Sequence, residues 1–289
     1  MVVFVILHYI ALDETIKCVD SIVSNVDGEK KIIVVDNYSP NDSYTKLKGY
    51  YLKSDVVEIL QTDKNIGFAN GNNFGYKYAL EKYNPDFMVV MNNDMEIKQS
   101  DFITRIFKCY EEHRFFIMGP DIYSTKKKYH QNPQTRKLPT LDELKKTQRS
   151  LWFKDKLKFL IRLKWILKNR QTKTVEVIDK SKDFVDEVII NPMLHGSCYI
   201  FSKDFMSRHS SECFYNKTFM YMEAEILYYQ ALRDKEMMVY CPDLHVDHHE
   251  DVATDAEYKK QYKKSIFSIQ CLLQSTGAFI ELMERDRTK

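Results

Sequence analysis

The sequence predicts an α/β protein built on a doubly wound, mostly parallel sheet. Two observations support this prediction. Over the first hundred residues, short apolar runs rich in β-branched residues alternate with segments of helical periodicity. Polar residues follow the carboxyl ends of three of these runs, which is the edge where open α/β sheets bind ligands. The β-α-β-α-β order implies parallel strands joined by right-handed crossovers.

The first half of the chain divides into strands and helices as follows. Val2–Leu7 is a continuous apolar run, as expected for a strand buried on both faces. We expect Asp13 to cap the helix that follows, in which apolar residues recur at helical spacing. A Gly/Asn-rich turn from Asn65 to Gly75 is predicted to lead into a helix over Tyr76–Lys82. Further strands are predicted over Ile32–Val35, Val56–Leu60 and Phe87–Met91.

The second half begins with a Lys/Arg-rich stretch, residues 134 to 185, that is predicted to be largely helical. A strand-like pattern returns at Val188–Phe201. A helix is expected around Glu223–Arg233 and a strand at Met237–Cys241, followed by a His-rich segment. The tail from Asp255 to Arg287 indicates one long helix or a pair of helices.

Composition excludes several classes of protein. With 44% hydrophobic and 13% aromatic residues the chain is able to bury a large core, and 8 Gly and 7 Pro exclude collagen-like material. Six cysteines without C-x-x-C spacing favour buried, reduced thiols over a zinc site or disulfides. The apolar run at the start is too short to span a bilayer and lacks the features of a signal peptide. We therefore expect a cytoplasmic protein.

The net charge of +2 averages two unequal parts of the chain. Residues 126–182 hold 18 Lys and Arg against 5 Asp and Glu, a charge of +13, and all other residues together carry −11. Nucleic-acid binding is one use for such a basic stretch. Because no nucleic-acid-binding module accompanies it, we expect no nucleic-acid partner.

Acidic and amide side chains at three strand ends predict one ligand site. Asp36-Asn37 ends the second strand, Asn92-Asn93-Asp94 ends the fourth, and the Asn-rich loop 65–73 lies between them. Each motif alone is also a common turn, but together they favour a single nucleotide-sized crevice. The chain lacks the glycine motifs of dinucleotide-binding and P-loop folds. A carboxylate held at a strand end is suited to a hard divalent cation.

Two further groups of titratable residues are candidates for chemistry. His245, His248 and His249 follow the strand at Met237–Cys241, and imidazole is a plausible partner for Asp94 at a metal. Glu223 and Glu225 lie two residues apart, so on a helix they point about 200° from each other. Only one of the two is expected to face a given site.

Taken in order, three segments resemble the bacterial family 2 glycosyltransferases, in particular the rhamnosyltransferase-like branch that builds surface polysaccharides. They are Val34-Val35-Asp36-Asn37-Tyr38-Ser39, Asn65 to Asn73, and Met91-Asn92-Asn93-Asp94. Later segments agree with the same family: His195-Gly196-Ser197, Phe219 to Glu223, and Pro242 followed by His248. The resemblance spans about residues 2–250, and the basic stretch is its least matched part.

The resemblance implies a GT-A fold, a nucleotide-sugar donor and inversion at the anomeric carbon. Asp36 resembles the acid that contacts uracil or thymine, with Asn37 beside it. Asn65, Gly67 and Asn70 lie on the loop that follows the donor nucleotide. The implied donors are UDP-hexoses and dTDP-rhamnose, and the implied acceptor is a growing, lipid-linked surface glycan.

The resemblance also implies a metal and an acceptor side. Asn92 and Asp94 match the two ends of the D-x-D motif, with Asn93 between them, so that Asp94 would ligate Mn²⁺ or Mg²⁺. His248 matches the histidine that often completes the metal or diphosphate site. The acceptor side would be lined by His195, Gly196 and Ser197.

One departure from the family pattern concerns the general base. Many relatives carry a second acid after the position of Glu223, and this sequence has Ala224 there. We then expect Glu223 or Glu225 to act as the general base that removes the proton of the acceptor hydroxyl. The alternative is a catalytically impaired subunit that binds the donor or acts as a scaffold.

The basic stretch contains a predicted amphipathic helix, Leu151–Arg170, with Trp152, Phe159 and Leu160 on its apolar side and lysines opposite. Such a helix is typical of contact with an anionic membrane, which would make the protein peripheral on the inner face of the cell membrane. The alternative is a helix packed on the protein's own core. The implied divisions are 1–125 as the donor half, 126–185 as a basic helical insertion, 186–252 as the acceptor half and 253–289 as a C-terminal helical segment.

Overall fold

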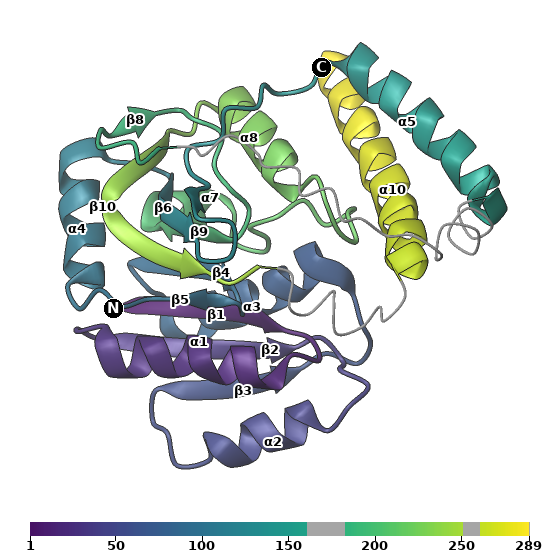
Figure 1. The fold of residues 1–289 in the computed structure, drawn as a ribbon. Helices are drawn as coiled ribbons and strands as arrows, with labels where there is room; N and C mark the ends of the chain where they lie inside the picture. Colours follow the sequence, from purple (N-terminus) through teal and green to yellow (C-terminus); the bar gives the residue numbers. More distant parts are fainter. Residues whose placement is uncertain (161–182, 251–260, 289) are drawn as a thin grey trace.

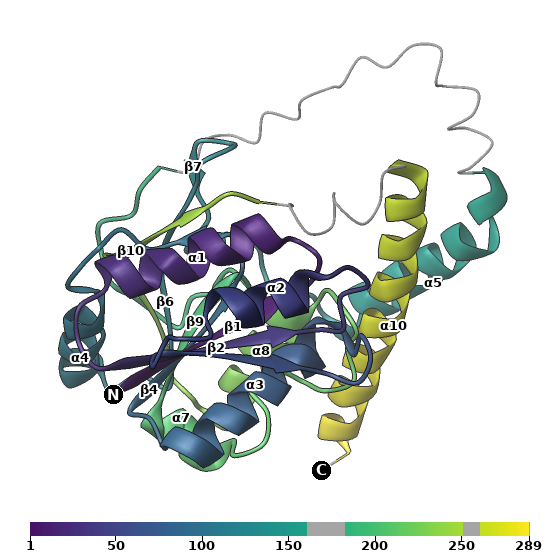
Figure 2. The same ribbon diagram turned by 90° about the horizontal axis from the view of Figure 1, so that it is seen from below.

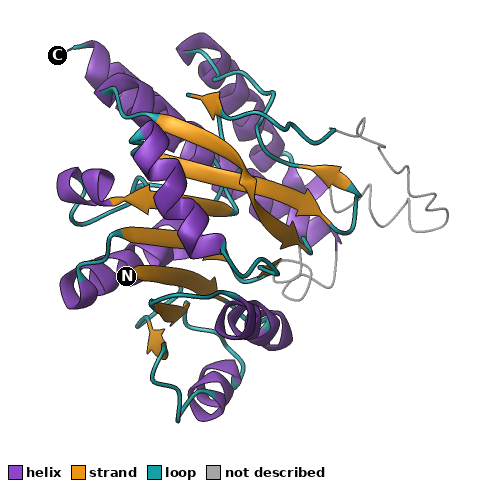
Figure 3. Ribbon diagram, turned by 90° about the vertical axis from the view of Figure 1, so that its left-hand side faces the viewer, coloured by secondary structure: helices purple, strands orange, loops and turns teal. Residues whose placement is uncertain are grey.

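The computed structural model describes residues 1–160, 183–250 and 261–288. Within these ranges a ten-stranded sheet has the order β3-β2-β1-β4-β9-β6-β10-β5, with β7 paired to β6 and β8 paired to β10. Helices cover both sides of this twisted sheet (Figure 3). A pair of helices, α5 and α10, stands to one side of it (Figures 1 and 2). The α/β prediction is confirmed.

The first half of the chain forms the parallel part of the sheet. Strands β2, β1 and β4 lie side by side and all run in one direction, with β3 parallel to β2 at the edge. Alternate residues of β1 enter two different cores, because Phe4 packs with Ile22 on one face and Val5 packs with Tyr76 on the other. This two-sided burial explains the continuous apolar run. The elements are β1 Val2–His8, α1 Leu12–Asn25, β2 Lys30–Asp36, α2 Ser43–Tyr50, β3 Val57–Gln61, α3 Gly67–Tyr83 and β4 Phe87–Asn92.

The predicted cap of α1 is wrong. Ala11 occupies the N-cap position and makes no side-chain capping bond, while Asp13 lies inside the first turn. A carboxylate in the first turn still interacts favourably with the helix dipole. The sequence signal therefore marked the right helix start but placed the cap two residues too late.

The predicted turn from Asn65 to Gly75 is wrong over most of its length, because α3 already begins at Gly67. Its glycines let the helix lie close to the sheet. A β-carbon on Gly71 would come within 2.5 Å of Leu7, and one on Gly75 within 2.6 Å of Val5. Tertiary packing thus overrides the low helix propensity of the Gly/Asn run.

The second half of the chain extends the sheet with mixed strands. Strand β10 runs parallel to β6 and is longer than predicted, because after an irregularity between Cys241 and His245 it continues to His248. The His-rich segment therefore belongs largely to the sheet. All six cysteines are buried, as expected. The elements are β5 Met95–Glu96, α4 Phe102–His113, β6 Ile117–Ser124, β7 Tyr129–His130, α5 Leu141–Lys156, β8 Ile189–Ile190, β9 Cys198–Ser202, α7 Lys203–Arg208, α8 Glu223–Asp234, β10 Met238–His248 and α10 Gln261–Arg287.

Helices α5 and α10 form an antiparallel pair (Figure 1). Lys145 and Glu284 form an ion pair of 2.6 Å near one end, and Gln270 donates to Asp155 at 3.2 Å nearer the other. Apolar residues of both helices form a separate core with Ile226 of α8, which joins the pair to the sheet domain. Among the described helices, the segment Tyr262–Arg287 of α10 is long and apolar enough to cross a membrane, a test that core helices also pass.

The amphipathic helix predicted over Leu151–Arg170 is only partly within the described residues, because 161–170 lie outside them. In the described part α5 ends at Lys156. Leu151 is buried, whereas Trp152, Phe153, Leu157, Phe159 and Leu160 are all 46–59% exposed. We refer to residues 152–160 as the apolar tip of α5. Here the predicted apolar side does not pack on the protein's own core.

Candidate functional site

A pocket of about 540 Å³ opens where β1, β2 and β4 end. Eight residues proposed from the sequence line it: Asn37, Asn65, Gly67, Asn92, Asn93, Asp94, His195 and His248. Eight others do not: Asp36, Asn70, Gly196, Ser197, Glu223, Glu225, His245 and His249. The strand ends that the sequence assigned to one crevice are therefore brought together around one cavity.

Asn37 joins the end of β2 to the loop before α3. Its Nδ2 donates to Asn65 Oδ1 and to the carbonyl oxygen of Gly67, both at 3.1 Å, and its Oδ1 accepts from the backbone of Ile66 at 3.0 Å. Asn65 Oδ1 also accepts from Gly67 N at 3.0 Å. These bonds hold the start of α3 against the pocket.

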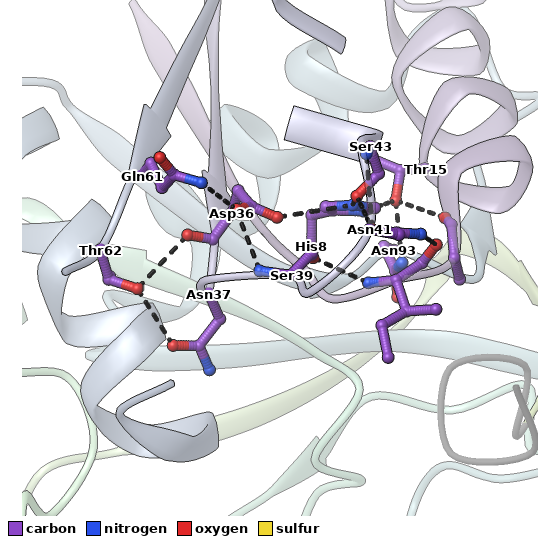
Figure 4. Close-up of polar contacts among 12 residues, drawn as sticks. His8, Thr15, Asp36, Asn37, Ser39, Asn41, Ser43, Gln61, Thr62 and Asn93 are labelled. Carbon is purple, nitrogen blue, oxygen red and sulfur yellow. Dashed lines mark hydrogen bonds and ion pairs between the residues drawn. The ribbon is translucent and has the colours of Figure 1, made fainter. Parts of the chain in front are cut away.

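Asp36 lies behind this wall and is wholly buried (Figure 4). Its Oδ2 accepts from Gln61 Nε2 at 2.9 Å and from the backbone of Ser39 at 3.2 Å. Its Oδ1 has no hydrogen-bond partner and lies 3.6 Å from His8 Nε2. The carboxylate therefore belongs to a buried polar layer beneath the pocket.

His8 is the centre of this buried layer. Its ring nitrogens lie 2.6 Å from Thr15 Oγ1 and 2.8 Å from Ser43 Oγ (Figure 4). Burial lowers the pKa of His8 to about 4, although the neighbouring Asp36 acts to raise it. Asn93 Nδ2 donates to Thr15 Oγ1 at 2.9 Å, so the layer links the end of β1 to the Asn-Asn-Asp turn.

Asp94 and His248 lie next to each other in the lining of the pocket. Asp94 Oδ1 is buried without a hydrogen-bond partner and lies 3.3 Å from His248 Nε2. A buried, unpaired carboxylate oxygen next to an imidazole nitrogen fits a divalent cation, since such ions take carboxylate oxygens together with substrate phosphates and water. The described residues contain no cluster of three or more His, Cys, Asp or Glu arranged around a metal. Two protein ligands would thus leave several positions to the substrate.

The two candidate acids of α8 differ in environment. Glu223 is only 7% exposed and its Oε1 has no hydrogen-bond partner. Burial raises the pKa of Glu223 to about 7, while hydrogen bonds from its own backbone and from Thr218 act to lower it. Glu225 instead forms an ion pair of 3.1 Å with Arg136. This difference fits the expectation that the two carboxylates point in different directions.

The turn before α8 is strained. Tyr221 and Met222 have φ values of 73° and 69°, in the left-handed region that residues with side chains rarely adopt. Such strain persists only where the surrounding structure holds it, and it is concentrated at functional sites. Met220, one residue earlier, lines the pocket.

The His-Gly-Ser segment packs beside Ala224. A β-carbon built on Gly196 would lie 3.7 Å from that of Ala224. His195 reaches the pocket, and its Nδ1 lies 2.8 Å from Ser197 Oγ and accepts from Ser197 N at 3.3 Å. Its ring centre is 5.7 Å from that of His248. The position of the missing acid therefore adjoins the predicted acceptor side.

Several lining residues were not found from the sequence: Tyr9, Lys127, Tyr129, Gln131, Phe219, Glu250 and Phe267. Glu250 and Phe219 carried a signal, because Glu250 belongs to the acidic end of the His-rich run and Phe219 to one of the segments that resemble the family. The others come from the residue after β1, the start of the basic stretch and the C-terminal helix. Nothing in their spacing indicates a common site.

Comparison with known proteins gives the context of this pocket. The family model described as glycosyl transferase family 2 matches residues 3–174. The low-salt glycan biosynthesis hexosyltransferase Agl10 of Haloferax volcanii is 27% identical over 104 residues, which cover 36% of this chain and 32% of the relative. The chain is thus matched over about a third of that relative's length.

Solved structures are similar at the level of the fold. S. aureus TarS 1–349 in complex with UDP has a TM-score of 0.52 at 11% identity, covering 95% of this chain and 64% of that one. GalNAc-T7 with UDP, GalNAc and Mn²⁺ has a TM-score of 0.56 at 11% identity, covering 87% and 43%. The match to the family model extends over more than half of the chain. The chain therefore belongs to glycosyl transferase family 2 and has the GT-A fold.

Proposed function

We propose that the chain is an inverting, metal-dependent transferase. It moves a sugar from a nucleoside-diphosphate donor, a UDP-hexose or dTDP-rhamnose, to a growing, lipid-linked glycan. The observation that carries the proposal is the pair Asp94 and His248, which lie side by side in a pocket that Asn37 and Asn65 also line. The UDP in TarS and the UDP, GalNAc and Mn²⁺ in GalNAc-T7 support this kind of ligand here.

Each wall of the pocket takes one part of the donor in this proposal. The amides of Asn37 and Asn65 bind the base, and Asp36 supports them from the buried layer. Asp94 and His248 hold Mn²⁺ or Mg²⁺, which when bound neutralises negative charge on the departing diphosphate. Lys127, which lines the same pocket, adds positive charge near the diphosphate.

We propose Glu223 as the general base. The acceptor hydroxyl forms its bond to the anomeric carbon as the bond to the diphosphate breaks, and Glu223 takes the hydroxyl proton. A pKa of about 7 is suited to this role, whereas the carboxylate of Glu225 is held in an ion pair with Arg136. Glu223→Gln should abolish transfer and Glu225→Gln should retain most of it. Full activity of Glu223→Gln would refute the assignment.

The central experiment measures nucleoside diphosphate release from a panel of UDP-hexoses and dTDP-rhamnose with Mn²⁺, Mg²⁺ or EDTA. One donor should be turned over only with a divalent cation. Asp94→Asn should remove that activity, while Asp142→Asn, an exposed aspartate in the first turn of α5, should not. Metal-independent turnover would contradict the proposed metal site.

The second candidate function is a donor-binding or scaffolding subunit without turnover, which Ala224 at the usual base position favours. The two candidate functions predict different effects of Ala224→Asp on activity. If the wild type binds UDP but releases none from any donor, and Ala224→Asp gains activity, the second candidate is correct.

The lipid-linked acceptor is supported by the apolar tip of α5. Trp152, Phe153 and Leu157 are exposed beside Lys154, Lys156 and Lys158, a combination suited to an anionic membrane surface. On α10, Gln270 contacts Asp155 of α5, and Phe267 one turn away lines the pocket. A membrane bound at the tip would thus lie near the pocket.

Liposome flotation tests this contact. Wild type should float with anionic vesicles, and Trp152→Ser/Leu157→Ser should not. The matched control is Tyr50→Ser/Leu52→Ser, which removes two exposed apolar residues at the end of α2. Equal flotation of all three proteins would refute a role for the tip.

A further inference from the structure

We propose that Gln131 and Glu250 are positioning residues that fix the tautomer of His248, so that its Nε2 presents a lone pair toward Asp94. The inference rests on the divalent-cation site proposed above. It deepens that proposal by naming residues, outside the two ligands, that prepare the site.

A short chain of hydrogen bonds carries the inference. His248 Nδ1 lies 2.7 Å from Gln131 Oε1, and Gln131 Nε2 donates to Glu250 Oε1 at 2.7 Å. All three residues are buried. Glu250 Oε2 also forms an ion pair of 3.0 Å with Lys127.

The orientation of the Gln131 amide follows from its partners. Gln131 Nε2 donates to Glu250 Oε1, and the other oxygen of this carboxylate is ion-paired with Lys127, so the group that faces Glu250 is the NH₂ of the amide. Turning the amide over would place two acceptor oxygens 2.7 Å apart in a buried site. The amide oxygen therefore faces His248.

The tautomer of His248 follows from the amide. Because an amide oxygen only accepts, Nδ1 of His248 must carry the hydrogen, and in the neutral ring Nε2 then carries the lone pair. Nε2 lies 3.3 Å from the buried Asp94 Oδ1, which has no hydrogen-bond partner. In this tautomer both atoms present a lone pair and no proton lies between them, so the arrangement favours the binding of a cation by both.

The inference is tested by the binding of Mn²⁺ alone, without any measurement of activity. Electron paramagnetic resonance measures this binding as a loss of the signal of free Mn²⁺. Gln131→Met removes the acceptor and should weaken Mn²⁺ binding about 10–100-fold, as is typical for loss of such supporting contacts. The double variant Gln131→Glu/Glu250→Gln exchanges carboxylate and amide. It keeps both hydrogen bonds and should restore most of the affinity.

Gln99→Met is the matched control, because Gln99 also makes two hydrogen bonds, with backbone groups of Asp243 and His245, and does not line the pocket. It should bind Mn²⁺ like wild type. Unchanged Mn²⁺ affinity in Gln131→Met, or a double variant that binds Mn²⁺ as weakly as Gln131→Met, would overturn the inference but not the metal site. A wild type that binds no Mn²⁺ would overturn the metal site and the inference together.

Discussion

Replacing Gly67 with alanine tests how the start of α3 is held beside the pocket. Gly67 has φ +82°, and a β-carbon built on it would lie 2.3 Å from the carbonyl oxygen of Phe219. An L-residue in the left-handed region costs about 1–2 kcal/mol. Moving Phe219 also breaks the 2.6 Å hydrogen bond from Phe68 N, worth about 1 kcal/mol. We therefore expect the free energy of unfolding to fall by about 2–3 kcal/mol.

Urea unfolding followed by circular dichroism measures this loss. Gly49→Ala is the matched control, because a β-carbon there meets no atom within 4 Å and Gly49 lies inside α2. It should leave stability unchanged or raise it by up to about 1 kcal/mol. Since Phe219 lines the pocket, Gly67→Ala should also weaken UDP binding, whereas Gly49→Ala should not.

Two results would refute this reasoning. If Gly67→Ala unfolds at the same urea concentration as Gly49→Ala, the close approach of Phe219 does not constrain the backbone. If stability falls but UDP affinity is unchanged, the contact between α3 and Phe219 stabilises the fold without shaping the donor side.

Three further predictions follow from the buried groups. The pKa of His8 is lowered in the folded state from 6.5 to about 4, so between these values the unfolded chain binds the extra proton; stability should decrease by up to about 3 kcal/mol as the pH is lowered through this window, and His8→Gln should lose this dependence in urea unfolding. Asn73→Leu should cost about 2–4 kcal/mol, measured by urea unfolding, because it removes three buried hydrogen bonds with the backbones of Cys213 and Phe214. The transfer rate at low donor concentration should rise with pH to a plateau above about 7 as Glu223 loses its proton; a flat profile would contradict its role as base.

The strands of the first half were predictable because their physical cause is local. A strand buried on both faces must be apolar throughout; β1 and β4 satisfy this condition at every position but the last, and β2 satisfies it over Ile32–Val35. The order of the elements then placed Asn37, Asn65 and Asp94 at one edge. The pocket brings together the residues that this argument grouped.

The start of α3 was not predictable because its cause lies elsewhere in the chain. Asn73 is a poor helix former, yet it bonds to the backbone of Cys213, 140 residues away in sequence. Gly71 and Gly75 occur in this helix because a β-carbon at either position would collide with a side chain of β1. The composition of residues 65–75 is typical of a turn. This segment is helical because of its contacts with β1 and with the backbone of Cys213.

Gln131 was missed for a similar reason. It reaches His248 because β6 and β10 pair in parallel, so that His248 lies opposite Ser124, while Gln131 N donates to Ile122 O in β6. Pairing between strands more than a hundred residues apart leaves no local pattern. A lone glutamine in a basic stretch has no spacing that indicates a supporting role at a metal site.

The same pairing changes how the charge asymmetry is understood. The stretch 126–182 was interpreted as a basic insertion facing a membrane or the acceptor. Its first residues instead face the pocket, where Lys127 pairs with Glu250 and Tyr129 and Gln131 form part of the wall. Arg136 then neutralises Glu225, so two of its positive charges meet carboxylates of the catalytic body. Lys127 and Arg136 are thus engaged with carboxylates, so the proposed membrane contact rests on the apolar tip of α5 and its exposed lysines, Lys154, Lys156 and Lys158.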